Sequence, residues 1–221
     1  AKYSVETSVW NPNKQKLTAV RTSLAQMKYN NNQAEQEFVI QAPSLWSPEM
    51  PALYSAETRL YEGDKLKDIY TTPFGIRSIE IIPDKGFFLN GKRTVFKGVC
   101  NHHDLGPLGA AVNDAAIRRQ IRILKDMGCN AIRTSHNMPA PELIRACDEM
   151  GMMIMAESFD EWNVAKCKNG YNLLFDEWAE KDLVNLLHNF RNNPSVVMWC
   201  IGNEVPNQWN EGDCKLSLIH I

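Results

Sequence analysis

Residues 195–204 read Ser-Val-Val-Met-Trp-Cys-Ile-Gly-Asn-Glu, and this stretch decides how the chain is interpreted. The apolar run from 195 to 201 predicts a buried strand that ends at Gly202. In a parallel α/β barrel, the residues just past the carboxyl end of a strand line the active site. The pair Asn203-Glu204 therefore predicts a carboxylic acid placed to exchange a proton. The alternative interpretation is a surface or helix-capping glutamate.

Strands and helices alternate through the second part of the chain, which indicates a parallel sheet. No glycine-rich phosphate loop follows any strand, so a barrel is favoured over a nucleotide-binding doubly wound sheet. Only four strand-helix units are visible, whereas a complete barrel has eight. The expected strands are Thr94–Val99, Asn130–Arg133, Met152–Ala156 and Val196–Ile201. The expected helices are about Ala115–Met127 (begun by Asn113 or Asp114), Pro141–Met150 and Asp176–Asn189.

The first part of the chain shows a different pattern. Short runs in which apolar and polar residues alternate are separated by turn residues. This pattern predicts an antiparallel, immunoglobulin-like sandwich over residues 1–83, followed by the first half of a TIM (β/α)8 barrel over 84–215. Phe87–Lys92 contains an Asn-Gly pair that predicts a hairpin. The expected strands are Tyr3–Trp10, Leu17–Ala25, Glu37–Gln41, Leu53–Tyr61, Lys67–Thr71 and Ile76–Ile82.

Composition excludes several classes of partner. The chain has 221 residues and a net charge of −2, which gives no electrostatic footprint for nucleic acid or anionic lipid. No apolar run approaches the roughly 18 residues that span a bilayer. The six cysteines lack Cys-x-x-Cys spacing, so buried free thiols are expected rather than a zinc site or a disulfide framework.

Polar clusters follow all four predicted barrel strands. Because the carboxyl ends of parallel strands meet at one edge, these clusters are expected to converge on a single pocket. A catalytic metal is the main rival interpretation, but adjacent side chains on an extended segment point in opposite directions, so His102 and His103 do not readily share an ion. The clusters are His102-His103-Asp104, Arg133 to Asn137, Glu157 to Trp162, and Asn203-Glu204.

At these residues the chain resembles glycoside hydrolase family 2, the group of β-galactosidases, β-glucuronidases and β-mannosidases. The most specific stretches are Asn130-Ala-Ile-Arg-Thr-Ser-His136 and Asn193-Pro-Ser-Val-Val-Met-Trp199 through Glu204. Further similarity lies at Leu45–Glu49, Phe74–Arg77, Phe87–Lys92 and Lys97–Val99.

The resemblance implies a retaining β-glycosidase without a cofactor. Glu204 matches the proton donor and general acid/base, and Asn203 matches the amide that contacts the sugar 2-hydroxyl. The other implied substrate-binding residues are His136, Arg133, His102, Asp104 and Glu157. His103 departs from the glutamate often found at its position. The segment after the third strand has no clear match to the magnesium site of some β-galactosidases, so no metal is expected.

Glycosidic cleavage needs a second carboxylate about 5 Å from the acid. The resemblance places that nucleophile after the seventh barrel strand, beyond Ile221, so none is assigned. Residues 216–221 resemble a translated sequencing adapter, and we expect a non-native tail. The chain is therefore expected to be an inactive internal fragment. Its parent is expected to act on oligosaccharides or other glycosides and to form homo-oligomers. A β-galactosidase is the first expectation; a β-glucuronidase, a β-mannosidase or a non-catalytic carbohydrate-binding relative are the alternatives.

Overall fold

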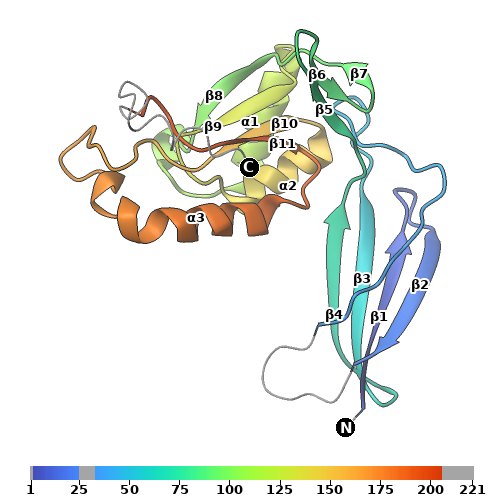
Figure 1. The fold of residues 1–221 in the computed structure, drawn as a ribbon. Helices are drawn as coiled ribbons and strands as arrows, with labels where there is room; N and C mark the ends of the chain where they lie inside the picture. Colours follow the sequence, from blue (N-terminus) through green and yellow to red (C-terminus); the bar gives the residue numbers. More distant parts are fainter. Residues whose placement is uncertain (1, 25–32, 206–221) are drawn as a thin grey trace.

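A four-stranded antiparallel sheet forms the first domain in the computed structural model, which describes residues 2–24 and 33–205 (Figure 1). Its strand order is β2-β1-β3-β4. Cross-strand contacts such as that between the hydroxyls of Thr7 and Thr58, 3.1 Å apart, tie the central pair together. The strands are β1 (Tyr3–Trp10), β2 (Lys16–Ser23), β3 (Tyr54–Glu62) and β4 (Lys65–Phe74).

The expected strand Glu37–Gln41 is wrong, because residues 33–41 form no strand in the structure. A side chain rather than a backbone ladder holds this segment: Gln36 Nε2 donates to the carbonyl oxygens of Val5 (3.2 Å) and Val20 (3.1 Å). The segment therefore lies against the first two strands without adding a strand to their sheet.

A small sheet and a buried tryptophan cover one end of the second domain. The sheet consists of β5 (Ile79–Ile82), β6 (Gly86–Leu89) and β7 (Lys92–Arg93). Asn90 (φ 53°) and Gly91 (φ 74°) form the predicted hairpin turn between its last two strands. Fully buried Trp46 packs with residues of this sheet and of the barrel strands, namely Phe87, Leu89, Ala131, Met153 and Val197.

Four parallel strands form the second sheet, in the order β11-β10-β9-β8. Ala131 and Met153 begin their strands, so the Trp46 cluster covers the amino ends of the sheet and leaves the carboxyl ends open. The strands are β8 (Gly98–His102), β9 (Ala131–Ser135), β10 (Met153–Glu157) and β11 (Val196–Cys200).

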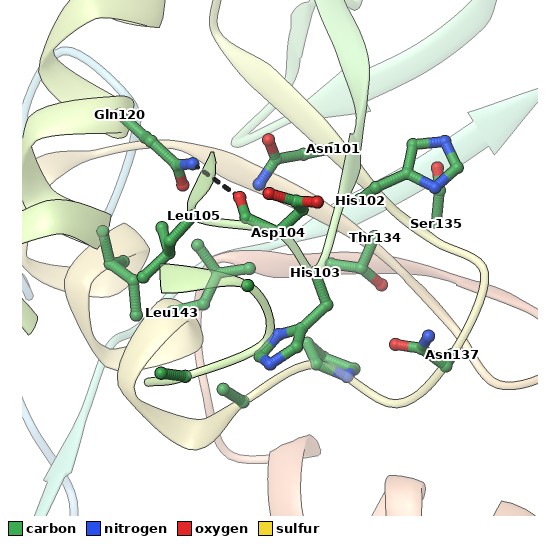
Figure 2. A pocket seen from close by; sticks show the side chains of 15 residues that line it. Asn101, His102, His103, Asp104, Leu105, Gln120, Thr134, Ser135, Asn137 and Leu143 are labelled. Atoms are coloured by element: carbon green, nitrogen blue, oxygen red, sulfur yellow. Dashed lines mark hydrogen bonds between the residues drawn. The ribbon is translucent and has the colours of Figure 1, made fainter. Parts of the chain in front are cut away.

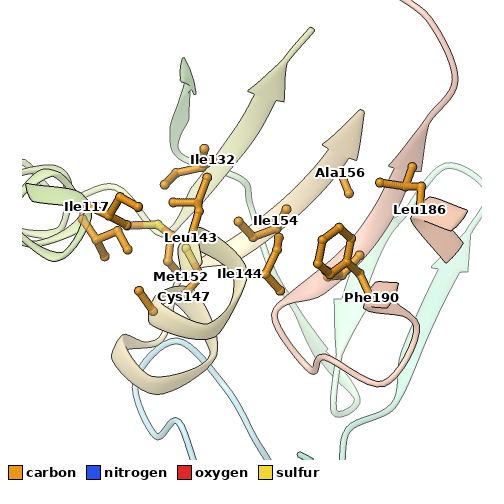
Figure 3. Close-up of a cluster of buried hydrophobic side chains, with 13 residues drawn as sticks. Ile117, Ile132, Leu143, Ile144, Cys147, Met152, Ile154, Ala156, Leu186 and Phe190 are labelled. Carbon is orange, nitrogen blue, oxygen red and sulfur yellow. The ribbon is translucent and has the colours of Figure 1, made fainter. Parts of the chain in front are cut away.

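Helices cover one face of this sheet, as expected for the outer layer of a barrel (Figure 1). They are α1 (Asp114–Asp126), α2 (Pro141–Met150) and α3 (Phe175–Phe190), each within one residue of its predicted bounds. Of the two candidate caps, Asn113 is the one used: its Oδ1 accepts from the Ala116 amide at 3.0 Å. Figure 3 shows the apolar core between helices and strands, which includes Ile132, Ile154, Ile144 and Phe190.

The first barrel strand begins four residues and ends three residues later than predicted, at 98–102 instead of 94–99. The side chain of Asn130 explains this shift, since its Oδ1 accepts from the Lys97 amide (2.8 Å) and its Nδ2 donates to the Val95 carbonyl (3.0 Å). These bonds satisfy the Lys97 amide and the Val95 carbonyl with side-chain partners, ahead of the residues that pair with β9. His102 is consequently the last residue of its strand rather than part of the loop behind it.

No helix within residues 2–24 and 33–205 is both long and apolar enough to cross a membrane.

The 221-residue chain, expressed by itself, is expected to aggregate and to show no glycosidase turnover. Strands β8 and β11 are the two edges of the parallel sheet, and unpaired edges recruit other chains. Large apolar side chains such as Val95 (55% exposed) and Leu173 (68% exposed) also face water. Light scattering with a nitrophenyl glycoside assay tests this expectation, which a monodisperse or active chain would contradict.

Candidate active site

The inner face of the parallel sheet carries most of the predicted site residues. Ile132, Ile154 and Ala156 point to the helices, so the residues that alternate with them point inward. The register pairs Cys100 with Arg133 and His102 with Ser135, and it pairs Glu157 with Cys200. Arg133 lies in the middle of its strand rather than at its predicted end, and Glu157 is the last residue of its strand rather than the first residue beyond it.

Glu157 is the centre of a charged cluster and is completely buried. Its Oε2 accepts from Arg133 Nε at 2.5 Å, and its Oε1 lies 2.6 Å from His136 Nδ1. The carboxylate is therefore satisfied by two side chains from the neighbouring strand and its loop, as a buried charge requires. His136 keeps its Nε2 for another partner, because Nδ1 is the ring nitrogen that meets Glu157.

Asn203, which follows β11, is bound to the same cluster by hydrogen bonds. Its Oδ1 accepts from Arg133 Nη2, and its Nδ2 donates to Asp160 Oδ1, both at 3.0 Å. Its backbone amide donates to the Phe159 carbonyl, also at 3.0 Å. The loops after β10 and β11 are thus joined to β9 through one amide side chain.

Opposing effects act on the pKa of Arg133. Partial burial lowers it, but contacts with Cys100 and Glu157 outweigh that effect, and the net pKa lies above its ordinary value. The guanidinium therefore stays charged and bridges a carboxylate to an amide at every physiological pH.

His102 extends the cluster toward the first strand. Its ring lies 5.0 Å from the ring of His136 in an edge-to-face arrangement. Five of the seven predicted site residues, Arg133, His136, Glu157, Asn203 and His102, are therefore brought together through direct contacts.

Asp104 and His103 are engaged beside this cluster rather than within it. Asp104 Oδ1 accepts from the Gly106 amide at 2.5 Å, and His103 Nε2 lies 2.9 Å from the Ala110 carbonyl. Both line a small pocket between the loops after β8 and β9, closed by Gln120 and Leu143 of the helices (Figure 2). The Asp104 backbone amide donates to the His102 carbonyl at 2.8 Å, but no described side-chain contact joins Asp104 to the other predicted site residues.

Glu204 follows Asn203 directly at the carboxyl edge, and its side chain is exposed. Trp199 does not form a wall beside this glutamate. The register places Trp199 opposite Ala156 on the helix-covered face, where it packs against the main core. A one-residue irregularity in the pairing of β10 with β11, beside Ile154, determines which side chains of β11 face the helices. The sequence alone does not reveal this irregularity.

No group of three or more potential metal ligands is found in the part of the chain that the structure describes. His102, His103 and His136 instead contact ring, backbone and carboxylate partners. His102 and His103 point to different surroundings, as alternation along an extended segment requires.

Two members of the site escaped the sequence analysis. Lys166 Nζ donates to Asp160 Oδ1 (3.2 Å) and to the Asn203 carbonyl (2.6 Å). Lys166 is the ninth residue after the end of β10 and lies in an irregular loop, so no periodic pattern marks it. Cys100 was interpreted as a core thiol, yet it is exposed and its Sγ lies 3.6 Å from Arg133 Nη1.

An inward-facing cluster of acid, amide, guanidinium and imidazole groups at the carboxyl edge of a parallel barrel sheet is the arrangement of a barrel enzyme's active site. Comparison with known families identifies which one. Residues 80–215 match the TIM barrel domain of glycosyl hydrolases family 2, and residues 1–77 match the family's preceding domain. The chain belongs to glycosyl hydrolases family 2, which confirms the predicted family and the predicted sandwich-then-barrel fold.

Individual relatives agree with this assignment. The chain is 50% identical over 176 residues to β-galactosidase BoGH2A of Bacteroides ovatus, covering 80% of this chain and 21% of that protein. It is 34% identical over 171 residues to a β-glucuronidase of Streptococcus agalactiae, covering 72% of this chain and 28% of that protein. The crystal structure of a β-glycosidase from Bacteroides vulgatus superposes with a TM-score of 0.85 at 37% identity, covering 99% of this chain and 27% of that one. The chain thus spans between 21% and 28% of the length of these relatives.

Proposed function

We propose that the chain is part of a longer retaining exo-β-glycosidase, termed the whole protein below, that removes terminal β-linked sugars. A β-galactoside is the proposed substrate, and the support is the 50% identity to a relative named β-galactosidase. A β-glucuronide or β-mannoside is the alternative within the enzyme class, supported by the 34% identity to a β-glucuronidase. A non-catalytic carbohydrate-binding relative is the alternative from another class.

Glu204 is the proposed general acid, which protonates the leaving oxygen and then serves as base for the attacking water. The observation that carries this proposal is the fixation of Asn203, its direct neighbour. Arg133 and Asp160 hold the two ends of the Asn203 amide, each at 3.0 Å. Such a carboxylic acid beside an immobilised amide provides a defined position for a sugar hydroxyl and for the bond to be cleaved.

The buried Glu157 has a supporting role in this proposal. Because Arg133 and His136 already engage both its oxygens, Glu157 is not free to attack an anomeric carbon. It fixes the two basic side chains, and His136 Nε2 is then the proposed contact to a sugar hydroxyl. His102, whose ring lies edge-to-face with that of His136, and Asp104 are proposed to complete the sugar-binding side of the site. The nucleophilic carboxylate is proposed to come from outside these 221 residues.

A panel of nitrophenyl glycosides tests the proposal on the whole protein. We expect turnover of the β-galactoside with net retention of configuration, followed by NMR, and at least tenfold lower kcat/KM for the β-glucuronide and β-mannoside, a difference of about 1.4 kcal/mol in transition-state binding. Preferred turnover of the β-glucuronide would replace the substrate assignment. Absence of turnover on every member, together with retained sugar binding, would support the non-catalytic alternative.

A further inference from the structure

Lys166 links the loop after β10 to the peptide that precedes Glu204. Its Nζ donates to the carbonyl oxygen of Asn203 at 2.6 Å and to Asp160 Oδ1 at 3.2 Å. That carbonyl belongs to the peptide bond between Asn203 and Glu204. Lys166 is exposed on a surface loop, and its side chain, which is 23% exposed, lies partly against the protein.

A buried carboxylate fixes the loop that carries this lysine. Glu161 is 2% exposed, and its carboxylate accepts from the backbone amides of Lys166 (2.5 Å) and Asn172 (2.9 Å). A Cβ atom at Gly170 would overlap that carboxylate, so the loop closes over Glu161 without space for a side chain there. The backbone of Lys166 is consequently held from within the protein, independently of its side-chain contacts.

Two further contacts from the same loop reach the chain around Asn203. Trp162 Nε1 donates to the Ile201 carbonyl at 2.7 Å, and the Phe159 carbonyl accepts from the Asn203 amide at 3.0 Å. Together with the bond from Lys166 to the Asn203 carbonyl, one loop therefore binds three backbone groups of this segment: the Ile201 carbonyl, the Asn203 amide and the Asn203 carbonyl. The Asn203 carbonyl, bound by Lys166, is the last of these groups and the one directly next to Glu204.

The backbone of Glu204 needs such support. Its φ of 45° lies in the left-handed region, which residues with a Cβ atom seldom occupy. A non-glycine residue remains there only where its surroundings determine the conformation. The ammonium of Lys166 binds the carbonyl at the amino side of this residue and thereby orients the peptide plane from which Glu204 projects.

Asp160 completes the arrangement as a shared acceptor. Partial burial raises the pKa of its carboxyl, but hydrogen bonds from Asn203 and Lys166 outweigh this effect, and the net pKa lies below its ordinary value. The carboxylate therefore remains ionised at neutral pH and holds the Asn203 side chain and the Lys166 ammonium through one oxygen.

We propose that Lys166 is a positioning residue for the general acid, acting through the Asn203 carbonyl and Asp160 to aim Glu204 at the leaving-group oxygen. The inference rests on the proposed acid role of Glu204 and adds to it the residue that sets its direction. Glycosides with poor leaving groups depend on a well-aimed acid, whereas activated aryl glycosides leave without one. Lys166 therefore matters for the first kind of substrate and hardly at all for the second.

Lys166→Met in the whole protein tests this inference. We expect kcat/KM for an alkyl β-glycoside to fall about 100-fold, the loss that a misplacement of about 1 Å produces. We expect kcat/KM for the dinitrophenyl glycoside of the same sugar to stay near that of the wild type. Lys166→Arg, which keeps the charge and the donors, should restore most of the alkyl glycoside activity. Lys168→Met, an exposed lysine of the same loop, is the matched control and should leave both substrates unchanged.

The outcomes separate this inference from the proposed function. A leaving-group-dependent loss in Glu204→Gln but not in Lys166→Met overturns the positioning role alone. No such dependence in Glu204→Gln removes the acid role and the inference with it. Equal losses on both substrates in Lys166→Met, with a lower melting temperature, would assign Lys166 to loop stability and overturn the inference. If that variant fails to fold, Asp160→Asn is measured instead: the same selective loss supports the inference, and unchanged activity contradicts it.

Discussion

Replacing Glu204 with glutamine in the whole protein is expected to lower kcat/KM for alkyl β-glycosides by about 10²–10⁴-fold, the usual contribution of a positioned general acid. The loss should be far smaller for dinitrophenyl glycosides, whose leaving groups depart as anions and need no proton. A plot of log kcat/KM against leaving-group pKa should therefore become much steeper in the variant.

Glu177→Gln supplies the control for that measurement. Glu177 lies on the outer helix α3 and pairs only with Lys181, at 3.5 Å, in the described contacts. It should leave both substrate classes unaffected. A uniform loss across all leaving groups in Glu204→Gln would count against the acid role and would favour a contribution to folding or sugar binding.

Replacing Glu157 with leucine is expected to give the second large effect, on stability as well as on turnover. The residue is completely buried, and its removal leaves the Arg133 guanidinium without its carboxylate. Breaking a fully buried ion pair costs about 3–5 kcal/mol; because the Arg133 side chain is 26% exposed and keeps its bond to Asn203, we expect a smaller loss, about 1–3 kcal/mol. The loss should appear as a lower denaturant midpoint of the whole protein, and turnover should fall because Arg133 also holds Asn203.

A double-mutant cycle gives this prediction its control. Arg133→Met combined with Glu157→Leu removes both charges, so the double variant should be more stable than Glu157→Leu alone, while its turnover should stay low. Strictly additive losses of stability would show that the two side chains are not coupled, and the described cluster would then not be the support of the site.

Much of the fold could be predicted from the sequence because its signals are local. The apolar spacing of Ile117 and Ile121, the cap at Asn113 and the glycine after Met150 fix helices to within a residue. The Asn90-Gly91 pair likewise predicts its hairpin turn directly. The strand Glu37–Gln41 was wrong because a single long-range side chain, Gln36, decides how that segment is held. Asn130 shifts the start of β8 for the same reason.

The clustering of polar side chains at the carboxyl edge was predictable where those residues end a strand or follow it, as at Glu157, His136 and Asn203. The site was not predictable where an irregularity in strand pairing sets the direction of a side chain, or where the path of a long loop brings in a distant residue. The irregularity beside Ile154 turns Trp199 toward the helices, and a buried carboxylate within a long loop brings Lys166 to the Asn203 carbonyl. Neither feature produces a recognisable pattern in the sequence of the neighbouring residues.

Azide rescue of the Glu204→Ala variant tests the central claim most directly. In a retaining mechanism without its general base, the covalent glycosyl-enzyme accumulates because water is poorly activated, whereas the azide anion attacks without needing a base. With an activated aryl β-galactoside, we predict that azide accelerates turnover and that the product is the β-glycosyl azide. No acceleration by azide, or formation of the α-glycosyl azide, would contradict the assignment of Glu204 as the acid/base of a retaining glycosidase.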